Sequence, residues 1–556
     1  MFFKKKPYYS DTWGLRLWKF LAWALGLTLL APVLVILLSL FSSLSPDSTE
    51  AWQQISSFLL KDAIKETIIL VIGSCVVASL LGIPAAWFVE NFDFPGKRLL
   101  SIALVLPLAI PPFIAAIISS DLREKLIPFL VKIRREEGVE SFLWWEEHLR
   151  YGCLILLFGS VLYPYVFLAG RSAFAGSGII MGEAGRMLGR SPWRVFSSVQ
   201  LPLARPALAA GIFLVAMEVI NDYGAVKHFG FNTLTVTLFT TWFGMDQIET
   251  AKKLASWILI SVFFLVALEH WHRGRALRSL HPEGVRSFGS PSSIITRIAC
   301  YLSCLVPISL GLFLPLFGLI DWLLKSSSIY DQIDWEEIIT ASRHTLILAL
   351  SSTVICIIAA LTIIGAARFS KNPILRVISK FSTVAGYACP GTVIALGVMG
   401  FAVALGNQFP SENWIGRLLV PSGFIWLLFA IVTRYFSIGS QMVQQGLARQ
   451  NKSLDQASFS LGKTPTETFF RINLPLLKPS ILGGATLVFV DVCKELPLCL
   501  LLRPFDFETL STLTYSKVDQ GAIYACAIPS LFLISVSMLG LIIVELNGWR
   551  KLSKTK

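Results

Sequence analysis

The sequence predicts an all-α polytopic membrane protein with about twelve transmembrane helices in two pseudo-symmetric halves. First, 54% of the 556 residues are hydrophobic and only 15% are charged, more apolar side chain than a soluble globular protein needs. Second, many apolar runs reach about 20 residues, the length at which a helix spans a bilayer. Third, residues 183–211 recur without a gap at 456–484, so that Gly189 matches Gly462. So long a period indicates two copies of one module.

Six predicted spans fall in each half. They cover residues 17–43, 67–89, 99–120, 151–170, 206–225, 254–271, 295–323, 344–366, 379–405, 421–440, 479–498 and 526–546. A polar stretch with four arginines, Arg273, Arg275, Arg278 and Arg286, separates the sixth span from the seventh. We therefore predict a first transmembrane domain over 1–272, a cytoplasmic linker over 273–294 and a second transmembrane domain over 295–556.

The distribution of Lys and Arg predicts which segments face the cytoplasm. The net charge of +13 does not indicate nucleic-acid binding here, because polytopic proteins gather basic residues in cytoplasmic loops. An inner N-terminus places roughly thirty of the 48 Lys and Arg residues inside, together with the C-terminus and both copies of the repeat. The outer loop at 121–150 is the exception, with six basic residues among several acids. It is interpreted as an amphipathic or small soluble insertion without a counterpart in the short loop at 406–420.

Prolines interrupt two equivalent spans. Pro107, Pro111 and Pro112 lie in the third span, and Pro390 lies in the ninth. Proline removes a helical hydrogen bond and kinks the helix. Within a bilayer, such a break is tolerated where neighbouring helices or a water-filled cavity satisfy the freed backbone groups. Two interpretations remain open, a static packing kink and a bend that lines a central pathway.

The sequence gives no sign of a metal site or a bound cofactor. The nine Cys and six His residues are dispersed, and no Cys pair has metal-ligand spacing. Residues 457–464 fit a relaxed phosphate-loop pattern, but they follow a polar loop after a span. A phosphate loop needs a preceding buried strand in an α/β domain, which is not predicted here. We therefore expect that the chain does not bind ATP itself.

The repeated segment predicts a short helix, a turn and a second helix at the cytoplasmic face. Small residues allow another surface to approach the backbone closely, a glycine ends the first helix, and a proline starts the second. The first copy contains Glu183, Ala184, Gly185, Gly189, Leu201 and Pro202, and the second contains Gln456, Ala457, Ser458, Gly462, Leu474 and Pro475. The alternative is an interfacial helix that rests on lipid headgroups, for which small residues are a poor choice.

This pattern resembles the EAA loop of permease subunits of binding-protein-dependent ABC importers. The first copy departs from the family pattern at Gly185, and the second has Gln456 in place of Glu, with Asp455 adjacent to it, and Ser458 in place of Ala. The resemblance implies that each segment docks on one of two ATPase subunits in the cytoplasm and transmits their closure to the membrane helices. It also implies a bacterial inner-membrane location and a periplasmic or lipid-anchored substrate-binding protein. ATP is then used by the partner subunits, and the chain itself is not an enzyme.

Over nearly the whole chain, the sequence is most similar to ferric-iron permeases, with thiamine permeases as near relatives. Residues 222–234 and 494–510 carry this resemblance, above all the string Lys-Glu-Leu-Pro that begins at Lys494. A thiamine or other small-solute permease remains an alternative. So do an ion-coupled secondary transporter, which also contains repeats, and a membrane scaffold with a degenerate second half.

The alignment of the two halves also pairs acidic residues. Glu218 matches Asp491, and Asp222 matches Glu495, so each half carries two acids at i and i+4 on the helix that leaves the repeated segment. Ionisable groups at membrane depth usually face a bundle interior or a water-filled cavity. One interpretation is local pairing, such as Lys494 with Asp491. The other is an acidic outer vestibule that guides a hard cation such as Fe³⁺, together with the helix breaks at Pro111 and Pro390.

Overall fold

The fold is built entirely from helices in the part of the chain that the computed structural model describes. That part comprises residues 13–42, 45–175, 187, 189, 191–273, 293–325, 334–370, 372–408 and 423–554. Ten helices in it are long and apolar enough to cross a membrane, or eleven if one bent pair counts as a single span. The predicted all-α polytopic membrane fold is confirmed.

The helices of the first half include a long pair, α3 and α7, that pack side by side and run in the same direction. The helices of this half are α1 (Trp13–Leu38), α2 (Pro46–Gln54), α3 (Leu60–Asn91), α4 (Lys97–Ala103), α5 (Pro112–Glu124), α6 (Ile127–Glu136), α7 (Val139–Ala173), α9 (Pro192–Val195), α10 (Leu201–Asn221), α11 (Gly224–His228), α12 (Leu234–Phe239) and α13 (Ile248–Arg273). Local signals set several boundaries; for example, Ser45 caps α2 and Pro46 occupies its first position.

The second half repeats this arrangement around α16 and α20. Its helices are α14 (Ile294–Ile308), α15 (Leu314–Lys325), α16 (Trp335–Phe369), α17 (Pro373–Ala388), α18 (Gly391–Gln408), α20 (Gly423–Arg449), α21 (Lys452–Ser460), α22 (Pro465–Thr468), α23 (Leu474–Cys493), α24 (Pro497–Leu502), α25 (Leu510–Asp519) and α26 (Ala527–Lys554). The sequence repeat is therefore also a structural one, because α22, α23 and α24 follow one another as α9, α10 and α11 do.

Two of the twelve predicted spans are broken rather than continuous. The third consists of Lys97–Ala109 and Pro112–Glu124, which meet at an angle of 90°. The ninth is divided into α17 and α18, with Pro390 in the gap between them. Proline accounts for both breaks, because it lacks the backbone N–H that would continue the helical ladder.

Each half places its first helix against the other half. The helix α1 packs on α16, α17 and α18, whereas α14 packs on α3 and α4. Trp18 of α1 lies 4.9 Å, between ring centroids, from Phe469 of the second half. These contacts between the halves bury apolar area that a helix on the rim of its own half would leave exposed, and they tie the two halves into one unit.

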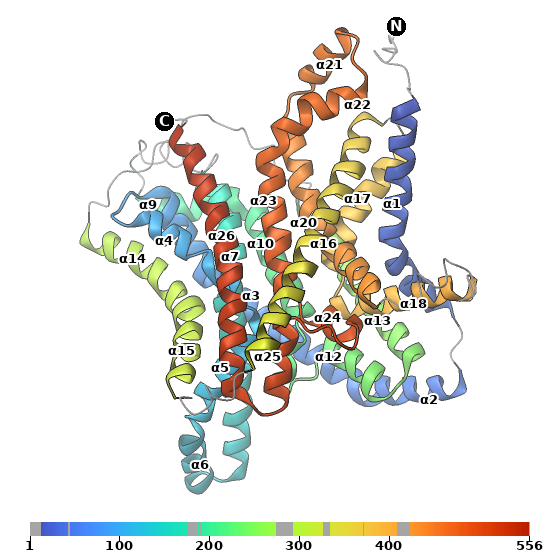
Figure 1. Ribbon diagram of the computed structural model, residues 1–556. Helices are drawn as coiled ribbons and strands as arrows, with labels where there is room; N and C mark the ends of the chain where they lie inside the picture. Colours follow the sequence, from blue (N-terminus) through green and yellow to red (C-terminus); the bar gives the residue numbers. More distant parts are fainter. Residues whose placement is uncertain are drawn as a thin grey trace.

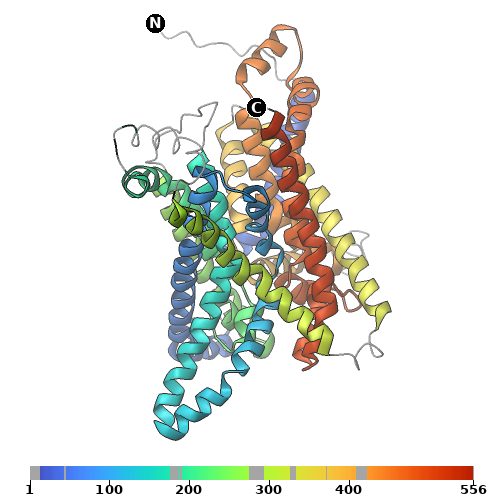
Figure 2. The ribbon, with the colours of Figure 1, turned by 90° about the vertical axis from the view of Figure 1, so that its left-hand side faces the viewer.

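The two ends of the molecule differ in shape. At one end α21 and α22 project beyond the bundle, and the start of α1 and the end of α26 lie at this same end (Figure 1). At the opposite end α6 and the first turns of α7 form a projecting hairpin (Figures 1 and 2). This hairpin is the 121–150 insertion. Most of the matching loop at 406–420 lies outside the described residues.

Candidate functional site

The second copy of the repeated segment forms an exposed helix–turn–helix. It consists of α21, a turn at Gly462 and α22, which Thr464 caps in a reciprocal pair of hydrogen bonds with Glu467. Gln456 and Ala457 are exposed. Ser458 is buried, and its hydroxyl lies 2.8 Å from that of Thr468, which fixes α21 against α22.

The first copy is described only in part. Glu183, Ala184 and Gly185 lie outside the described residues. Gly189 has a φ of +77° and Gly462 a φ of +78°, so the two turns share a left-handed backbone that favours glycine. This agreement shows that the repeat extends to the backbone conformation of the turn.

Both copies continue through a widened helical turn. Phe196–Gln200 and Phe469–Asn473 are π-helical, and the N–H groups of Leu201 and Leu474 donate to carbonyls five residues earlier. Pro202 and Pro475 follow directly and have no N–H to donate. The recurring Leu-Pro pair thus marks the point at which the exposed segment passes into α10 or α23. Single π-turns of this kind are frequent at functional sites.

A buried amide anchors each of these turns. Gln200 accepts a hydrogen bond of 2.6 Å from the Trp87 indole and donates one of 2.8 Å to Asn91 of α3. At the matching position, Asn473 donates to Asp455 of α21 at 3.0 Å. These hydrogen bonds tie the first π-turn to α3 and the second to α21.

Asp455 does not stand in for the missing Glu at position 456. Its side chain is only 9% exposed and forms an ion pair of 2.8 Å with Arg368 of α16. Arg368 also donates to the Leu447 carbonyl at 2.7 Å. Asp455 thus holds α21 onto the bundle, and the exposed residue at this place is the neutral Gln456.

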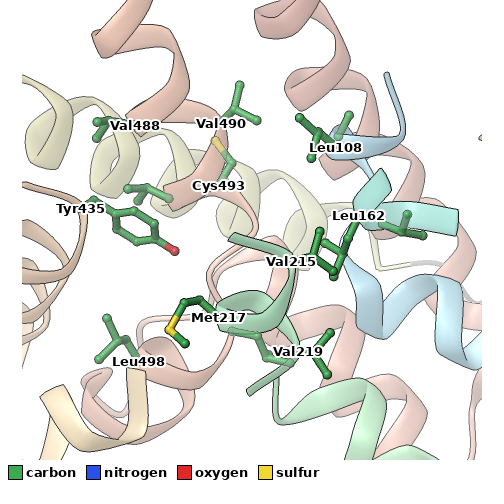
Figure 3. Close-up of a cluster of buried hydrophobic side chains, with 14 of the residues drawn as sticks. Leu108, Leu162, Val215, Met217, Val219, Tyr435, Val488, Val490, Cys493 and Leu498 are labelled. Carbon is green, nitrogen blue, oxygen red and sulfur yellow. The ribbon is translucent and has the colours of Figure 1, made fainter. Parts of the chain in front are cut away.

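The paired acids come together where the ends of α10 and α23 meet. Figure 3 shows this junction, to which α10 contributes Val215, Met217 and Val219 and α23 contributes Val488, Val490 and Cys493. A cavity opens beside these residues, lined by segments of both halves. Its charged lining residues are Glu218, Asp222, Arg434, Lys494 and Glu495. Asp491 is not among the lining residues, but its carboxylate forms an ion pair of 2.8 Å with the Lys494 ammonium group.

The prediction that each half places its two acids on one face of the same helix is wrong, because the second acid of each pair lies outside the helix. The helix α10 ends at Asn221 and α23 ends at Cys493, so Asp222 and Glu495 lie beyond the helix ends. Each carboxylate instead accepts a hydrogen bond from the first turn of the next short helix. Asp222 accepts from the N–H of Ala225 at 2.8 Å, and Glu495 from that of Leu498 at 3.0 Å. This satisfies donors that a helix start leaves open.

One helix-breaking proline lines this cavity, and the other precedes a glycine that contacts two of the lining residues. Pro111 lies at the 90° bend and belongs to the cavity lining. Pro390 precedes Gly391, where an added Cβ would lie 2.3 Å from the Arg434 guanidinium and 3.3 Å from the Glu495 carboxylate. The glycine after Pro390 thus leaves the space that the Arg434 guanidinium occupies.

Comparison with known proteins decides the family. The model of the binding-protein-dependent transport system inner membrane component family matches residues 78–268 and again 352–548. The chain belongs to this family. It is thus a permease with two copies of the family module, as the repeat predicted.

Individual relatives of the permease fall into two size classes. The Fe(3+)-transport system permease protein FbpB 2 of Haemophilus influenzae is 23% identical over 474 residues, covering 84% of this chain and 86% of the relative. The ferric transport system permease protein FbpB of Actinobacillus pleuropneumoniae is 21% identical over 497 residues, covering 84% and 68%. The molybdenum transport system permease protein ModB of H. influenzae is 27% identical over 230 residues, covering 39% of this chain and 95% of the relative. A relative of the second class therefore matches one half of the permease.

The junction of the permease is symmetric in its acids but not in its cations. Glu495 accepts hydrogen bonds from Arg434, at 2.8 Å, and from the Tyr435 hydroxyl. At the matching positions of the repeat, the first half has Val161 and Leu162 in place of Arg434 and Tyr435, and Asn221 in place of Lys494. The cations at this junction therefore come from the second half alone.

Sequence reasoning missed Arg434, although the sequence contains a signal for it. Arg434 lies near the middle of the span Gly423–Arg449, where an ionisable residue is costly and usually has a partner. Its partner Glu495 is one of the four predicted acids. The pairing of Lys494 with Asp491, one of two interpretations that the sequence allows, is present at 2.8 Å, and Lys494 also donates to the Leu108 carbonyl at 3.0 Å.

Within the described residues, no three His, Cys, Asp or Glu side chains are grouped closely enough to hold a metal ion. Glu218 receives a hydrogen bond of 3.3 Å from the Tyr165 hydroxyl.

Proposed function

We propose that this permease carries ferric iron across a bacterial inner membrane. The observation that carries the proposal is the convergence of Glu218, Asp222 and Glu495 from the two halves on one cavity at the α10–α23 junction. Carboxylate oxygens suit a hard cation. The two relatives cited above that match 84% of this chain are named as ferric permeases, whereas the molybdenum relative matches 39% of it. The two cations at the junction, Arg434 and Lys494, are each in contact with a carboxylate, which disfavours an oxyanion substrate.

The projecting segments suggest how the pathway is powered. On this proposal, the end that carries α21 is cytoplasmic, the termini lie inside, and each repeated segment docks on one ATP-hydrolysing subunit. A substrate-binding protein delivers iron to the opposite end. The chain performs no covalent chemistry and binds no cofactor. Closure of the ATPase subunits moves α10 and α23 through the anchored π-turns, and the junction at their far ends alternates between closed and open.

The substrate is tested by ATP-dependent uptake of labelled ferric iron, with labelled thiamine and sulfate in parallel, in cells with and without this chain. We expect iron uptake to be lost on deletion while uptake of the other two solutes is unchanged. Loss of thiamine or sulfate uptake instead would contradict the iron proposal and leave the family membership intact.

The acids themselves are tested with the double variant Glu218→Gln/Asp491→Asn. We expect iron uptake to fall about tenfold or more, which corresponds to about 1.4 kcal/mol. The change removes the Glu218 carboxylate from the cavity lining and leaves the Lys494 cation there without its partner Asp491, and both effects disfavour a trivalent cation. The amount of co-purified ATPase should not change, since docking takes place at the far end. The control Glu50→Gln/Asp62→Asn removes two exposed acids outside the cavity. Equal uptake by the two double variants would refute an acidic vestibule.

A further inference from the structure

A second cavity, of about 580 Å³, lies at the end of the second half that carries α21. It is bounded by the last turns of α16 and α20, the first turns of α17 and the start of α21, which Figure 1 shows converging below the projecting segment. A cavity of this size falls within the range of small-molecule sites.

The cavity is strongly basic. Arg368, Arg376, Lys380 and Lys452 line it, and no Asp or Glu is among its lining residues. Ser379 and Gln444 add polar groups. Arg376 donates to the Ser370 carbonyl at 2.8 Å, which holds its guanidinium in place without neutralising it. Such a lining suits an anion with several acceptor oxygens, and a phosphate group fits this description.

The same helix that supplies two of the cations has an apolar exposed face. On α17, Ile374, Val377 and Phe381 are 53%, 49% and 58% exposed, at a spacing that places them along one side of the helix. Arg376 and Lys380 lie between them in sequence and line the cavity. An amphiphile could therefore place its charged group in the cavity and its hydrocarbon chains along this face. Basic pockets between transmembrane helices at the cytoplasmic side have the character of sites for anionic lipid headgroups.

The cavity also adjoins the coupling helix. Arg368 lines it and forms the ion pair with Asp455 of α21, and Lys452 is the first residue of α21. We propose that the cavity binds the phosphate group of an anionic phospholipid of the inner leaflet, and that the bound lipid steadies α21 for contact with the ATPase. The assignment to the inner leaflet rests on the orientation in the proposed function. The lipid-binding measurement itself does not depend on iron as the substrate.

The test uses the full chain with its ATPase subunit in nanodiscs. Binding of labelled phosphatidylglycerol and phosphatidylcholine is compared for the wild type, Arg376→Gln/Lys380→Gln and the control Lys478→Gln, which removes an exposed charge of α23 outside the cavity. We expect the wild type and the control to prefer phosphatidylglycerol. The double variant should lose about fivefold in affinity for each charge removed. ATP hydrolysis should rise with phosphatidylglycerol in the wild type but not in the double variant.

Four results would overturn the proposal. One is equal binding of the two lipids by the wild type, and another is unchanged phosphatidylglycerol affinity in the double variant. The third concerns the source of the phosphate: displacement of the labelled lipid by millimolar inorganic phosphate, without selectivity between lipids, would identify a site for a soluble anion. Loss of ATPase co-purification in the double variant with lipid affinity unchanged would assign the cavity to the protein partner instead.

Discussion

Replacing Arg434 by Met is expected to destabilise the permease by about 3–5 kcal/mol and to abolish transport. The Arg434 and Glu495 side chains are only 9% and 3% exposed, and their atoms lie 2.8 Å apart. Removing one partner of a buried ion pair leaves the other charge without compensation, which is the costly case. Thermal unfolding of the purified chain in detergent measures the stability, and uptake of labelled iron measures transport.

A second variant separates the loss of stability caused by the unpaired charge from the loss caused by the smaller side chain. Arg434→Met/Glu495→Gln removes both charges, and the amide oxygen of the introduced glutamine can still accept the Leu498 N–H that Glu495 accepts at 3.0 Å. We expect this double variant to recover most of the stability, since a neutral, well-packed pair often replaces a buried ion pair without loss. The control Arg503→Met breaks a partly exposed pair with Glu508, which should cost no more than about 1 kcal/mol. If the double variant is as unstable as Arg434→Met, the charge pairing is not what stabilises the junction.

Transport by the double variant then shows what the pair does. A stable protein that no longer transports would mean that the charges act in the pathway, whereas restored transport would limit the pair to a structural role. A comparison with the first half of the chain favours a role in the pathway. Val161 and Leu162 line the same cavity at the positions that match Arg434 and Tyr435, so an ion pair at this position is not required to build the fold.

Features that depend on the repeat could be predicted from the sequence. Two copies of one module fold alike, and so the alignment of the halves is enough to pair Gly189 with Gly462 and Pro202 with Pro475. The two glycines share a left-handed backbone, as expected for equivalent positions of a repeat. Such agreement is local, because the nearby sequence determines turns and helix starts.

Features that depend on long-range contacts could not be predicted in this way. The end of α10 before Asp222 depends on which backbone N–H groups the carboxylate can reach, and an i, i+4 spacing does not contain that information. The packing of α1 on the opposite half could not be predicted either, because the sequence of a largely apolar helix does not show against which half it packs. The role of Asp455 required its partner Arg368, which lies 87 residues away in the sequence.

Replacing Gly462 by Asp is expected to uncouple ATP hydrolysis from transport, with uptake reduced at least about tenfold. The surface of this turn is open to an external partner. The adjacent Leu461 is 81% exposed, and no described atom lies within 4 Å of a Cβ added at Gly462. If this turn docks on an ATPase subunit as proposed, a new carboxylate would be buried in that contact without a partner, which costs several kcal/mol. Uptake and ATP hydrolysis are measured on the same reconstituted complex.

The variant Gly462→Asn is the matched control, because Asn has nearly the same shape as Asp, tolerates the left-handed φ of +78° and adds no charge. It should keep most of the uptake, whereas retained uptake in Gly462→Asp with normal ATPase co-purification would refute a coupling role. Gly189→Asp, at a φ of +77°, makes the same change in the first half. Since the second half has the neutral Gln456 where the first has Glu183, a larger loss in Gly189→Asp than in Gly462→Asp would mean that the first segment transmits most of the ATPase closure to the pathway.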